Sequence, residues 1–417
     1  MIRFIRLLIA STFLFSTITF AQTQGIHLSW NSNKIDVTTN TMAITWWGNK
    51  LNEGIVKYGT DNRLSHTQKA INRFSDKGKV NIYKTTLTHL NPNTIYYYQC
   101  GSVGEGWSNV YKFKTAPVAG SKDKIVVGVW GDTQDNDFNT RFEQTDTIVQ
   151  QLKRYPIQFT IHMGDIVNSG SAANKWKGLF SITQPINAIA PFMPIPGNHD
   201  VNNNKADTGF QKPFPVYYEF MNLPGSTINY SFNYGNTHFV AINSGQGEKD
   251  AEVAANFAYA KDSPEYRWLE ADLSKARKDK NIIWVILYLH HPLYSFGWSQ
   301  VEGWHERLTP LLDKYQVDLC LAGHRHVYER HKAIRDNQAL PQKDDHIYQN
   351  PAGTVYITNG SAGGQPTGLG GSDMPSMIYT SRVKMYNYAI MTIEGNTIQY
   401  DVYNNHGVKI DYFKLIK

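Results

Sequence analysis

Short apolar stretches alternate with turn residues between about residues 25 and 117 of the chain. Four of these stretches, rich in aromatic and β-branched side chains, are residues 42–47, 54–59, 96–100 and 110–114. Such side chains favour strands, and regularly spaced turns between them are typical of an antiparallel sandwich. The pattern therefore predicts an all-β sandwich, followed by a linker at residues 116–120.

The pattern changes at residue 124, where buried apolar runs begin to alternate with amphipathic stretches. Strands are expected at residues 125–130, 157–163, 282–289, 317–322, 388–393 and 398–403. Helices are expected at residues 142–153 and 266–273, where the sequence has helical character and apolar residues recur with helical spacing. Alternating strands and helices predict an α/β domain in this second part of the chain.

The first 21 residues resemble an export signal. Arg3 and Arg6 precede a mostly apolar segment at residues 7–20, and Ala21 is a small residue suited to cleavage. The alternative is a membrane anchor, but the segment is short for a span of about 20 apolar residues and Ser and Thr dilute it. We therefore expect a signal peptide at 1–21, the sandwich at 22–117 and the α/β domain at 118–417. This organisation predicts a secreted or periplasmic protein without a transmembrane segment in its mature chain.

The charge and the cysteine content of the chain exclude few classes of protein. The formal net charge is +6, of which Arg3 and Arg6 belong to the predicted signal, and the remaining Lys and Arg are scattered. No nucleic-acid footprint is expected from that distribution. The two cysteines, Cys100 and Cys320, lie in different predicted domains, each within a strand-like run. An exported protein can form disulfides, but separate buried thiols are the prediction here.

Five polar motifs each follow an apolar, strand-like run. They are Trp-Gly-Asp-Thr-Gln at 130–134, Met-Gly-Asp at 163–165, Pro-Gly-Asn-His-Asp at 196–200, Leu-His-His-Pro at 289–292 and Ala-Gly-His-Arg-His at 322–326. Each alone is weak evidence, because a Gly-Asp after a strand is usually a turn or a helix cap. Together they gather carboxylates, amides and imidazoles beyond the carboxyl ends of strands, where open α/β sheets bind ligands. Burying so many polar groups unpaired is costly, and a metal would satisfy them together.

The ligand types indicate which ions such a site would hold. Carboxylate, imidazole and amide oxygen without a thiolate suit Zn, Fe, Mn or Co. The number of candidate ligands exceeds the four that one tetrahedral zinc needs. Two ions about 4 Å apart, bridged by a carboxylate, would use them all.

The five motifs, in this order and spacing, resemble those of the calcineurin-like metallophosphoesterases, and among these the purple acid phosphatases. The resemblance runs from about residue 25 to residue 412 and includes residues 230–239 and 323–330 and the Trp268-Leu269 helix. The sandwich is similar to the fibronectin type III-like domain that precedes the catalytic domain in plant-type members. The implied fold is that sandwich followed by an α/β metallophosphoesterase domain, with two packed β-sheets flanked by helices.

The resemblance also implies a role for each matching position. The implied ligands are Asp132, Asp165 and His326 for the first ion, and Asp165, Asn198, His290 and His324 for the second. Asp165 would bridge the two ions, which are expected to be divalent or mixed-valence transition metals (Fe, Zn or Mn). His199 would lie beside them without binding metal, where it would orient the phosphate or protonate the leaving group.

One departure from the family pattern concerns the metals. The purple colour of the family comes from a tyrosinate on ferric iron, three residues after the bridging aspartate, and Asn168 stands there in this chain. A purple Fe(III)-tyrosinate centre is therefore not expected. Gln134 lies two residues after Asp132, where related enzymes have a His or Gln ligand, and we expect it to bind the first ion. The alternative is that Gln134 only forms hydrogen bonds to the ligands.

A second departure concerns substrate contacts. Plant-type members have a histidine pair nine and ten residues beyond the ligand in the fourth motif, and the corresponding residues after His290 are Ser299 and Gln300. His305 is the nearest histidine downstream. It is a candidate substitute, and a surface helix residue is the alternative.

Two further polar residues are candidates for supporting roles. His291 follows the expected ligand His290, and neighbours on an extended segment point in opposite directions. His291 is therefore predicted to support the site rather than bind metal. Asp200 is expected to form a hydrogen bond to a neighbouring His, with a turn cap as the alternative.

The implied reaction is hydrolysis of a small phosphate monoester by a metal-bound hydroxide, with His199 as the acid. A phosphodiesterase or nucleotide hydrolase with the same metal core is the alternative, because the residues that would contact the substrate have changed. A third reading is a non-catalytic cell-surface binding protein. Competent residues at every metal position except the tyrosine argue against it. The sequence does not indicate a ligand for the sandwich or an oligomeric state.

Overall fold

The computed structural model describes residues 23–32, 34, 37–49, 53–102, 106–135, 141–200, 215–224, 229–244, 259–295, 304–367, 376–380 and 384–417. The predicted signal peptide lies outside these residues, as do Ser299 and Gln300. In the described part of the chain, no helix combines the length and apolar character needed to cross a membrane.

The N-terminal part is the predicted β-sandwich. Its strands are β1 (Gln24–Ser29), β2 (Met42–Gly48), β3 (Ile55–Gly59), β4 (His66–Lys69), β5 (Ile71–Ser75), β6 (Val80–Leu87), β7 (Ile95–Ser102), β8 (Gly106–Trp107) and β9 (Tyr111–Lys114). One sheet has the order β1-β2-β6-β5, and the other has the order β4-β3-β7-β8 with β9 also on β7. All four predicted strands are present, because their aromatic and β-branched residues fill the space between the two sheets.

The second part contains two large sheets, as the family resemblance implied. The first has the order β12-β11-β10-β22-β23-β24-β19. Its strands are β10 (Ile125–Trp130), β11 (Phe159–His162), β12 (Phe192–Pro194), β19 (Ile347–Gln349), β22 (Asn387–Glu394), β23 (Thr397–Asn404) and β24 (Lys409–Ile416). Here β10, β11 and β12 are parallel, so their carboxyl ends lie at the same edge.

The second sheet has the order β13-β14-β15-β16-β20-β17-β18, with β21 on β17. Its strands are β13 (Tyr230–Tyr234), β14 (Thr237–Ala241), β15 (Trp284–Leu289), β16 (Leu319–Ala322), β17 (Tyr328–Arg335), β18 (Gln338–Ala339), β20 (Thr354–Asn359) and β21 (Met377–Thr380). The four strands β14, β15, β16 and β20 are parallel. The two sheets pack face to face; for example, the rings of Phe159 and Phe239 meet edge to face at 5.2 Å.

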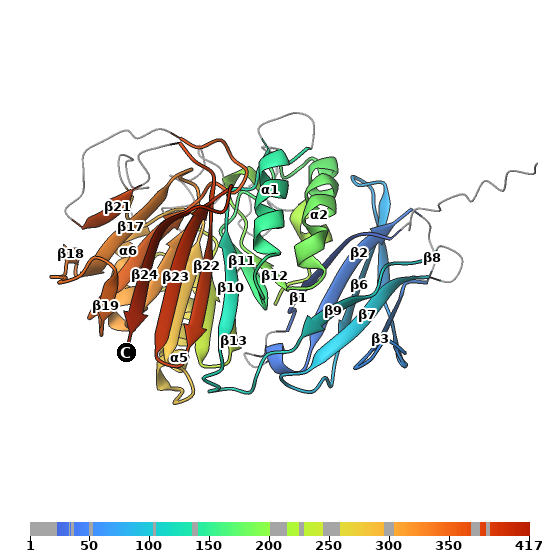
Figure 1. The fold of residues 1–417 in the computed structure, drawn as a ribbon, viewed down its shortest axis with the longest axis horizontal. Coiled ribbons are helices and arrows are strands. Elements are labelled where there is room, and N and C mark those ends of the chain that lie inside the picture. The colour runs from blue at the N-terminus through green and yellow to red at the C-terminus, as the bar shows by residue number, and fades with distance from the viewer. Residues whose placement is uncertain are drawn as a thin grey trace, which may run out of the picture.

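Helices flank this pair of sheets. They are α1 (Glu143–Leu152), α2 (Ala173–Asn187), α3 (Pro215–Phe220), α5 (Pro264–Lys278) and α6 (Trp304–Lys314), with short 3-10 turns η1 (Val37–Thr39) and η2 (Asn198–Asp200). Helices α1 and α2 lie between the first sheet and the sandwich (Figure 1), and α5 packs against β15. The helices predicted at residues 142–153 and 266–273 correspond to α1 and α5.

The sandwich and the α/β part share one hydrophobic core. Trp30, directly after β1, is fully buried against Phe159, Phe232 and Tyr234 of the two large sheets, at ring distances of 5.4 to 5.9 Å. The Tyr98 hydroxyl donates to the carbonyl of Ala188 at 2.7 Å. These contacts are those of a domain interior, so the two parts are expected to fold as one unit.

Both cysteines are free and buried, Cys100 in β7 and Cys320 in β16. The prediction of two separate thiols is confirmed.

Candidate metal centre

All five polar motifs lie at the carboxyl ends of strands, but they come from two sheets rather than from the edge of one. Asp132, Asp165 and Asn198 follow β10, β11 and β12 of the first sheet. His290 follows β15 and His324 follows β16 of the second sheet. The site therefore lies where the strand ends of the two packed sheets meet.

The backbone turns sharply at three of the ligand positions. Asp132, Asp165 and His324 have φ angles of 57°, 49° and 65°, in the left-handed region that non-glycine residues rarely adopt. Each such residue costs about 1–3 kcal/mol and persists only when its surroundings hold it there. The turns direct these side chains back toward a common point beyond the strands.

One group of donor atoms contains an amide and two imidazoles. Asn198 Oδ1 lies 2.9 Å from His290 Nε2 and 3.0 Å from His324 Nδ1, and the two ring nitrogens are 3.2 Å apart. Ligands held about 2.1 Å from one ion are about 3.0 to 3.4 Å apart in octahedral or tetrahedral geometry. The three atoms therefore have the mutual spacing of ligands to a single ion, as predicted for the second metal.

A second group contains Asp132, Gln134, Asp165 and His326. Asp132 Oδ1 lies 3.5 Å from His326 Nε2, and Gln134 Nε2 lies 3.1 Å both from His326 Nε2 and from Asp165 Oδ2. Gln134 Oε1 is buried and has no hydrogen-bond partner among the described residues. The two ends of an amide exchange places by a half-turn about the last side-chain bond. A cation in this group would give that oxygen a partner, so the residues fit the predicted first metal, and a ligand role for Gln134 stays a prediction.

Asp165 lies between the two groups. Its Oδ1 is 3.3 Å from His290 Nε2 and accepts the backbone N–H of His199 at 2.8 Å. Its Oδ2 is 3.1 Å from Gln134 Nε2. One carboxylate oxygen faces each group, which is one of the arrangements by which a carboxylate can bridge two ions.

The space between the groups depends on glycine. A Cβ atom on Gly197 would lie 2.3 Å from Asp165 Oδ1 and 2.8 Å from His290 Cε1, far inside van der Waals contact. A Cβ on Gly364 would lie 2.5 Å from His326 Cε1. Any larger residue at these positions would displace a ligand side chain, so Gly197 in the third motif and Gly364 outside the motifs leave room for the donor atoms to converge.

The electrostatics of the metal-free site show how strongly it favours a cation. Burial tends to raise the pKa of Asp165, but His290 and the other imidazoles outweigh burial and hold that pKa below its usual range. Burial tends to lower the pKa of His290, yet the Asp165 carboxylate raises it to about 9. A proton on His290 thus provides in the metal-free protein the positive charge that an ion would supply. Burial also raises the pKa of Asp132 and lowers that of His324.

His199 lies beside the two groups, as the family resemblance implied. Its Nε2 is 3.9 Å from Asp165 Oδ2 and its Nδ1 is 3.4 Å from the carbonyl of Asn168. The side chain is 40% exposed, whereas Asp165 is buried. The ring is therefore accessible to a substrate from solvent.

The predicted direction of His291 is wrong. Strand β15 ends at Leu289, so residues 290 and 291 lie in a bend and the alternation of an extended strand does not apply. The ring of His291 lies 4.3 Å from that of His324, and a nitrogen of each of His290, His291 and His324 lies within 4.8 Å of the others. Its Nδ1 is 3.0 Å from Ser244 Oγ. The predicted supporting role of His291 remains a prediction.

Asp200 corresponds to the turn-cap alternative, and the expected hydrogen bond to a histidine is wrong. Its carboxylate accepts the backbone N–H groups of Ile166, Val167 and Gly197 at 2.8 to 3.0 Å. Burial, followed by the negative charge of Asp165, raises the pKa of Asp200 to about 7. Asp200 therefore ties the loop of the second motif to that of the third.

His305 lies in the first turn of α6 and packs edge to face on Tyr294 at a ring distance of 4.6 Å. Its described contacts do not include the two ligand groups, so the structure gives no support to a substrate role.

Sequence reasoning missed two residues that position the ligands. Ser244 Oγ accepts the backbone N–H groups of His290 and His291 at 3.1 and 2.8 Å. Thr133 Oγ1 donates to the carbonyl of Ile166 at 2.9 Å and lies 3.1 Å from His162 Nε2. Ser244 follows the apolar run of β14, so the rule used for the motifs would have found it, whereas Thr133 gave no separate signal.

Comparison with known proteins agrees with this geometry. The family model described as calcineurin-like phosphoesterase matches residues 125–328. The model described as the N-terminal domain of purple acid phosphatases matches residues 23–115.

Two relatives show the extent of the similarity. Acid phosphatase type 7 of Mus musculus is 30% identical over 407 residues, covering 90% of this chain and 85% of that protein. Purple acid phosphatase 21 of Arabidopsis thaliana is 29% identical over 299 residues, covering 70% of this chain and 60% of that protein. The alignment thus leaves part of the plant protein without a counterpart.

Solved structures support the fold. Purple acid phosphatase PPD1 from Lupinus luteus superposes with a TM-score of 0.79 at 20% identity, covering 95% of this chain and 74% of that chain. A structure of PhoD superposes with a TM-score of 0.69 at 12% identity, covering 94% of this chain and 92% of that chain. Given the whole-chain similarity to the mouse protein and both family models, this chain belongs to the purple acid phosphatase-like group of the calcineurin-like phosphoesterases, a family of metal-dependent hydrolases of phosphate esters.

Proposed function

We propose that this protein is an exported phosphatase that uses a pair of metal ions to hydrolyse phosphate monoesters. The observation that supports it best is the position of Asp165, whose two oxygens face two separate groups of donor atoms. The proposed export depends on the apolar segment after Arg3 and Arg6.

Ions bound at the two groups would neutralise phosphate oxygens and lower the pKa of a bound water to about 7. The chain contributes the ligands that would fix the two positions. One ion would be held by Asp132, Gln134 and His326. The other ion would be held by Asn198, His290 and His324. Asp165 would bind both ions. Asn168 offers no phenolate, so we propose Zn, Mn or Fe without the purple charge-transfer colour.

His199 is the proposed acid for the leaving group. In the protonated ring, Nδ1–H would donate to the carbonyl of Asn168, 3.4 Å away, and Nε2–H would supply the transferable proton. Nε2 is on the side of Asp165 Oδ2, and the ring is open to solvent. A proton donated to the departing oxygen typically contributes about 10²–10⁴-fold in rate.

The experiment that tests the function uses the mature protein from residue 22 onward. Its metal content is measured after reconstitution with Zn, Mn or Fe, and p-nitrophenyl phosphate and bis-p-nitrophenyl phosphate are assayed across pH. Two ions per chain and faster turnover of the monoester support the proposal. Faster turnover of the diester favours the phosphodiesterase alternative. A protein that binds no metal and turns over neither compound would contradict both the phosphatase and the phosphodiesterase proposals.

A further inference from the structure

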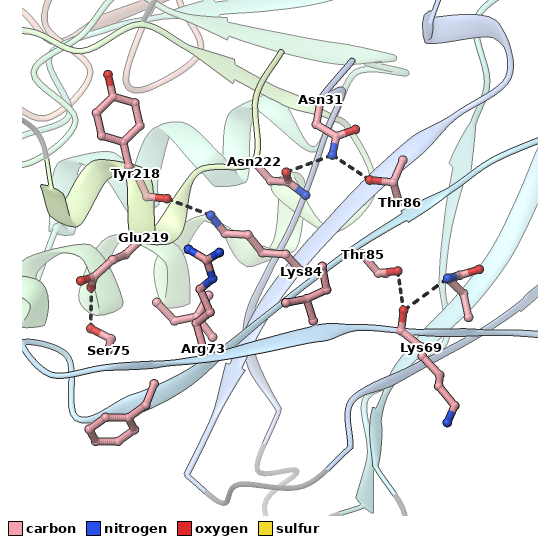
Figure 2. A pocket seen from close by; sticks show the side chains of 14 residues that line it. Asn31, Lys69, Arg73, Ser75, Lys84, Thr85, Thr86, Tyr218, Glu219 and Asn222 are labelled. Atoms are coloured by element: carbon pink, nitrogen blue, oxygen red, sulfur yellow. Dashed lines mark hydrogen bonds between the residues drawn. The ribbon is translucent and has the colours of Figure 1, made fainter. Parts of the chain in front are cut away.

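A cleft of about 620 Å³ lies between the sandwich and α3, away from the metal centre. Its floor is the face of β5 and β6, and its opposite wall is formed by Tyr218 and Glu219 of α3 and by Asn222 after the helix (Figure 2). None of the metal ligands lines it. A volume of this size is in the range of small-molecule sites, which often lie between domains.

Charged and apolar side chains alternate on the floor of the cleft because of the register between β5 and β6. Ile71 pairs with Lys84 and Arg73 pairs with Ile82, so these four side chains share one face of the β5–β6 ladder. The two cations therefore alternate with the two isoleucines. Arg73 and Lys84 lie on a diagonal of this pattern, and Figure 2 shows both beneath Tyr218 and Glu219.

Cations outnumber carboxylates among the residues that line the cleft: Lys69, Arg73 and Lys84 stand against Glu219. Lys84 Nζ donates to the carbonyls of Tyr218 and Met221 at 2.8 and 2.5 Å, and both partners are uncharged. Within the described residues, neither Arg73 nor Lys84 forms an ion pair. The nearby carboxylate of Glu219 accepts the Ser75 hydroxyl at 2.6 Å.

The electrostatic environment of Lys84 agrees with an excess of cations. Burial, followed by the positive charge of Arg73, lowers the pKa of Lys84 to about 8, although Glu219 acts in the other direction. An anion between the two cations would relieve their repulsion. It would also favour the charged form of the lysine.

Apolar surface lines the same cleft. Ile71 is 72% exposed and shares its face of the ladder with Arg73, Ile82 and Lys84. Phe74 is 54% exposed at the edge of the cleft, but as the neighbour of Arg73 in β5 it points to the other face. On the opposite wall, Tyr218 turns its backbone carbonyl toward Lys84 and its ring away from it (Figure 2). Exposed apolar residues gathered at a concave surface commonly mark a binding site.

We propose that this cleft binds a small organic anion, with its acid group between Arg73 and Lys84 and its apolar body against Ile71 and Ile82 on the same face of the ladder. The acid group is a carboxylate, sulfonate or phosphate, since each presents several acceptor oxygens to a guanidinium and an ammonium. The site is separate from the metal centre and does not depend on the proposed phosphatase activity.

The test is a fluorescence titration of the metal-loaded protein with anilinonaphthalenesulfonate, an aromatic anion, and with N-phenylnaphthylamine, its neutral analogue. We expect one sulfonate per chain and much weaker binding of the neutral compound. Arg73→Gln and Ile71→Asp, both at exposed positions, should each raise the Kd of the sulfonate about tenfold or more. Arg63→Gln, on an exposed arginine paired with Asp61, is the matched control and should leave that Kd unchanged.

Three results would overturn the proposal. The first is an unchanged Kd in Arg73→Gln while its melting temperature and hydrolytic activity match those of the wild type. The second is displacement of the sulfonate by inorganic phosphate at the metal centre in wild type and Arg73→Gln alike. The third is self-association of the chain that Ile71→Asp abolishes, without any binding of the sulfonate, which would identify the cleft as a contact between two copies.

Discussion

Asp165 Oδ1 lies 3.3 Å from His290 Nε2, and this pair joins the carboxyl end of a strand in one sheet to that of a strand in the other. In the metal-free protein the pair is a carboxylate and an imidazolium. Each partner shifts the pKa of the other toward its charged form. The relationship predicts both how the site binds metal and how it responds to pH.

Replacing Asp165 with alanine should abolish measurable hydrolysis, because the donor groups lose the one carboxylate that faces both. Metal content should fall from two ions per chain to one or none, measured by elemental analysis after desalting. Asp123→Ala, at an exposed aspartate before β10, is the control. An Asp165→Ala protein that keeps two ions would show that Asp165 does not bridge them.

Metal binding should release a proton near neutral pH. The pKa of His290 is about 9 without metal, so its ring is protonated below that pH and must lose the proton to become a ligand. The apparent affinity of the protein for zinc should therefore rise about tenfold per pH unit because of this one proton, and it should level off above pH ~9. Calorimetric titration of zinc in buffers of different ionisation enthalpy counts the protons released. No buffer dependence near pH ~7 would contradict the charged Asp165–His290 pair.

His199→Ala should keep its metals and lose rate in a way that depends on the leaving group. Alkyl phosphates, whose leaving oxygens need a proton, should slow by about 10²–10⁴-fold, and p-nitrophenyl phosphate by much less. Kinetics with both substrates and metal analysis of the same samples check this. His406→Ala, on an exposed turn, is the control. Loss of metal from His199→Ala would assign the residue to the ligands instead.

Substitution of Gln134 should separate its two possible roles. Mutation of a residue that only orients ligands typically lowers metal affinity by about 10–100-fold, so a larger loss in Gln134→Leu would indicate direct coordination. Gln134→His should restore binding, because an imidazole is also a competent ligand. Competition titrations with a chelator of known affinity measure both variants. If Gln134→Leu lowers the metal affinity only weakly and Gln134→His does not restore it, Gln134 only forms hydrogen bonds to the ligands.

Trp30→Ala should destabilise the catalytic part although the residue follows a strand of the sandwich. Truncating a buried tryptophan typically costs about 3–5 kcal/mol, and Trp30 contacts three aromatic rings of the two catalytic sheets. Denaturant unfolding followed by fluorescence and by residual activity should show both signals shifting together. Trp107→Ala, at a partly exposed residue in β8, is the control and should have a much smaller effect. Separate transitions for the two signals would contradict a shared folding unit.

Much of the candidate site could be predicted because each of its motifs is local. Asp132, Asp165, Asn198 and His324 each follow a glycine or a short turn at the end of an apolar run, and parallel strands bring such ends together. The roles of Asp200 and His291 could not be predicted, since they depend on backbone from other segments. Asp200 accepts amides more than thirty residues earlier in the chain as well as that of Gly197.

The sequence by itself determined the two-part organisation, the strands and helices around the motifs, the buried thiols and the chemical types of the ligands. These follow from periodicity and residue chemistry, which act over a few residues. Only the tertiary structure decided that the ligands come from two sheets, that Asp165 turns one oxygen to each group, that Trp30 joins the sandwich to the catalytic core, and that Arg73 and Lys84 share a cleft with α3. Each of these depends on which segments distant in sequence pack together, because side-chain distances of a few ångström are set by packing across the whole chain and not by local preference.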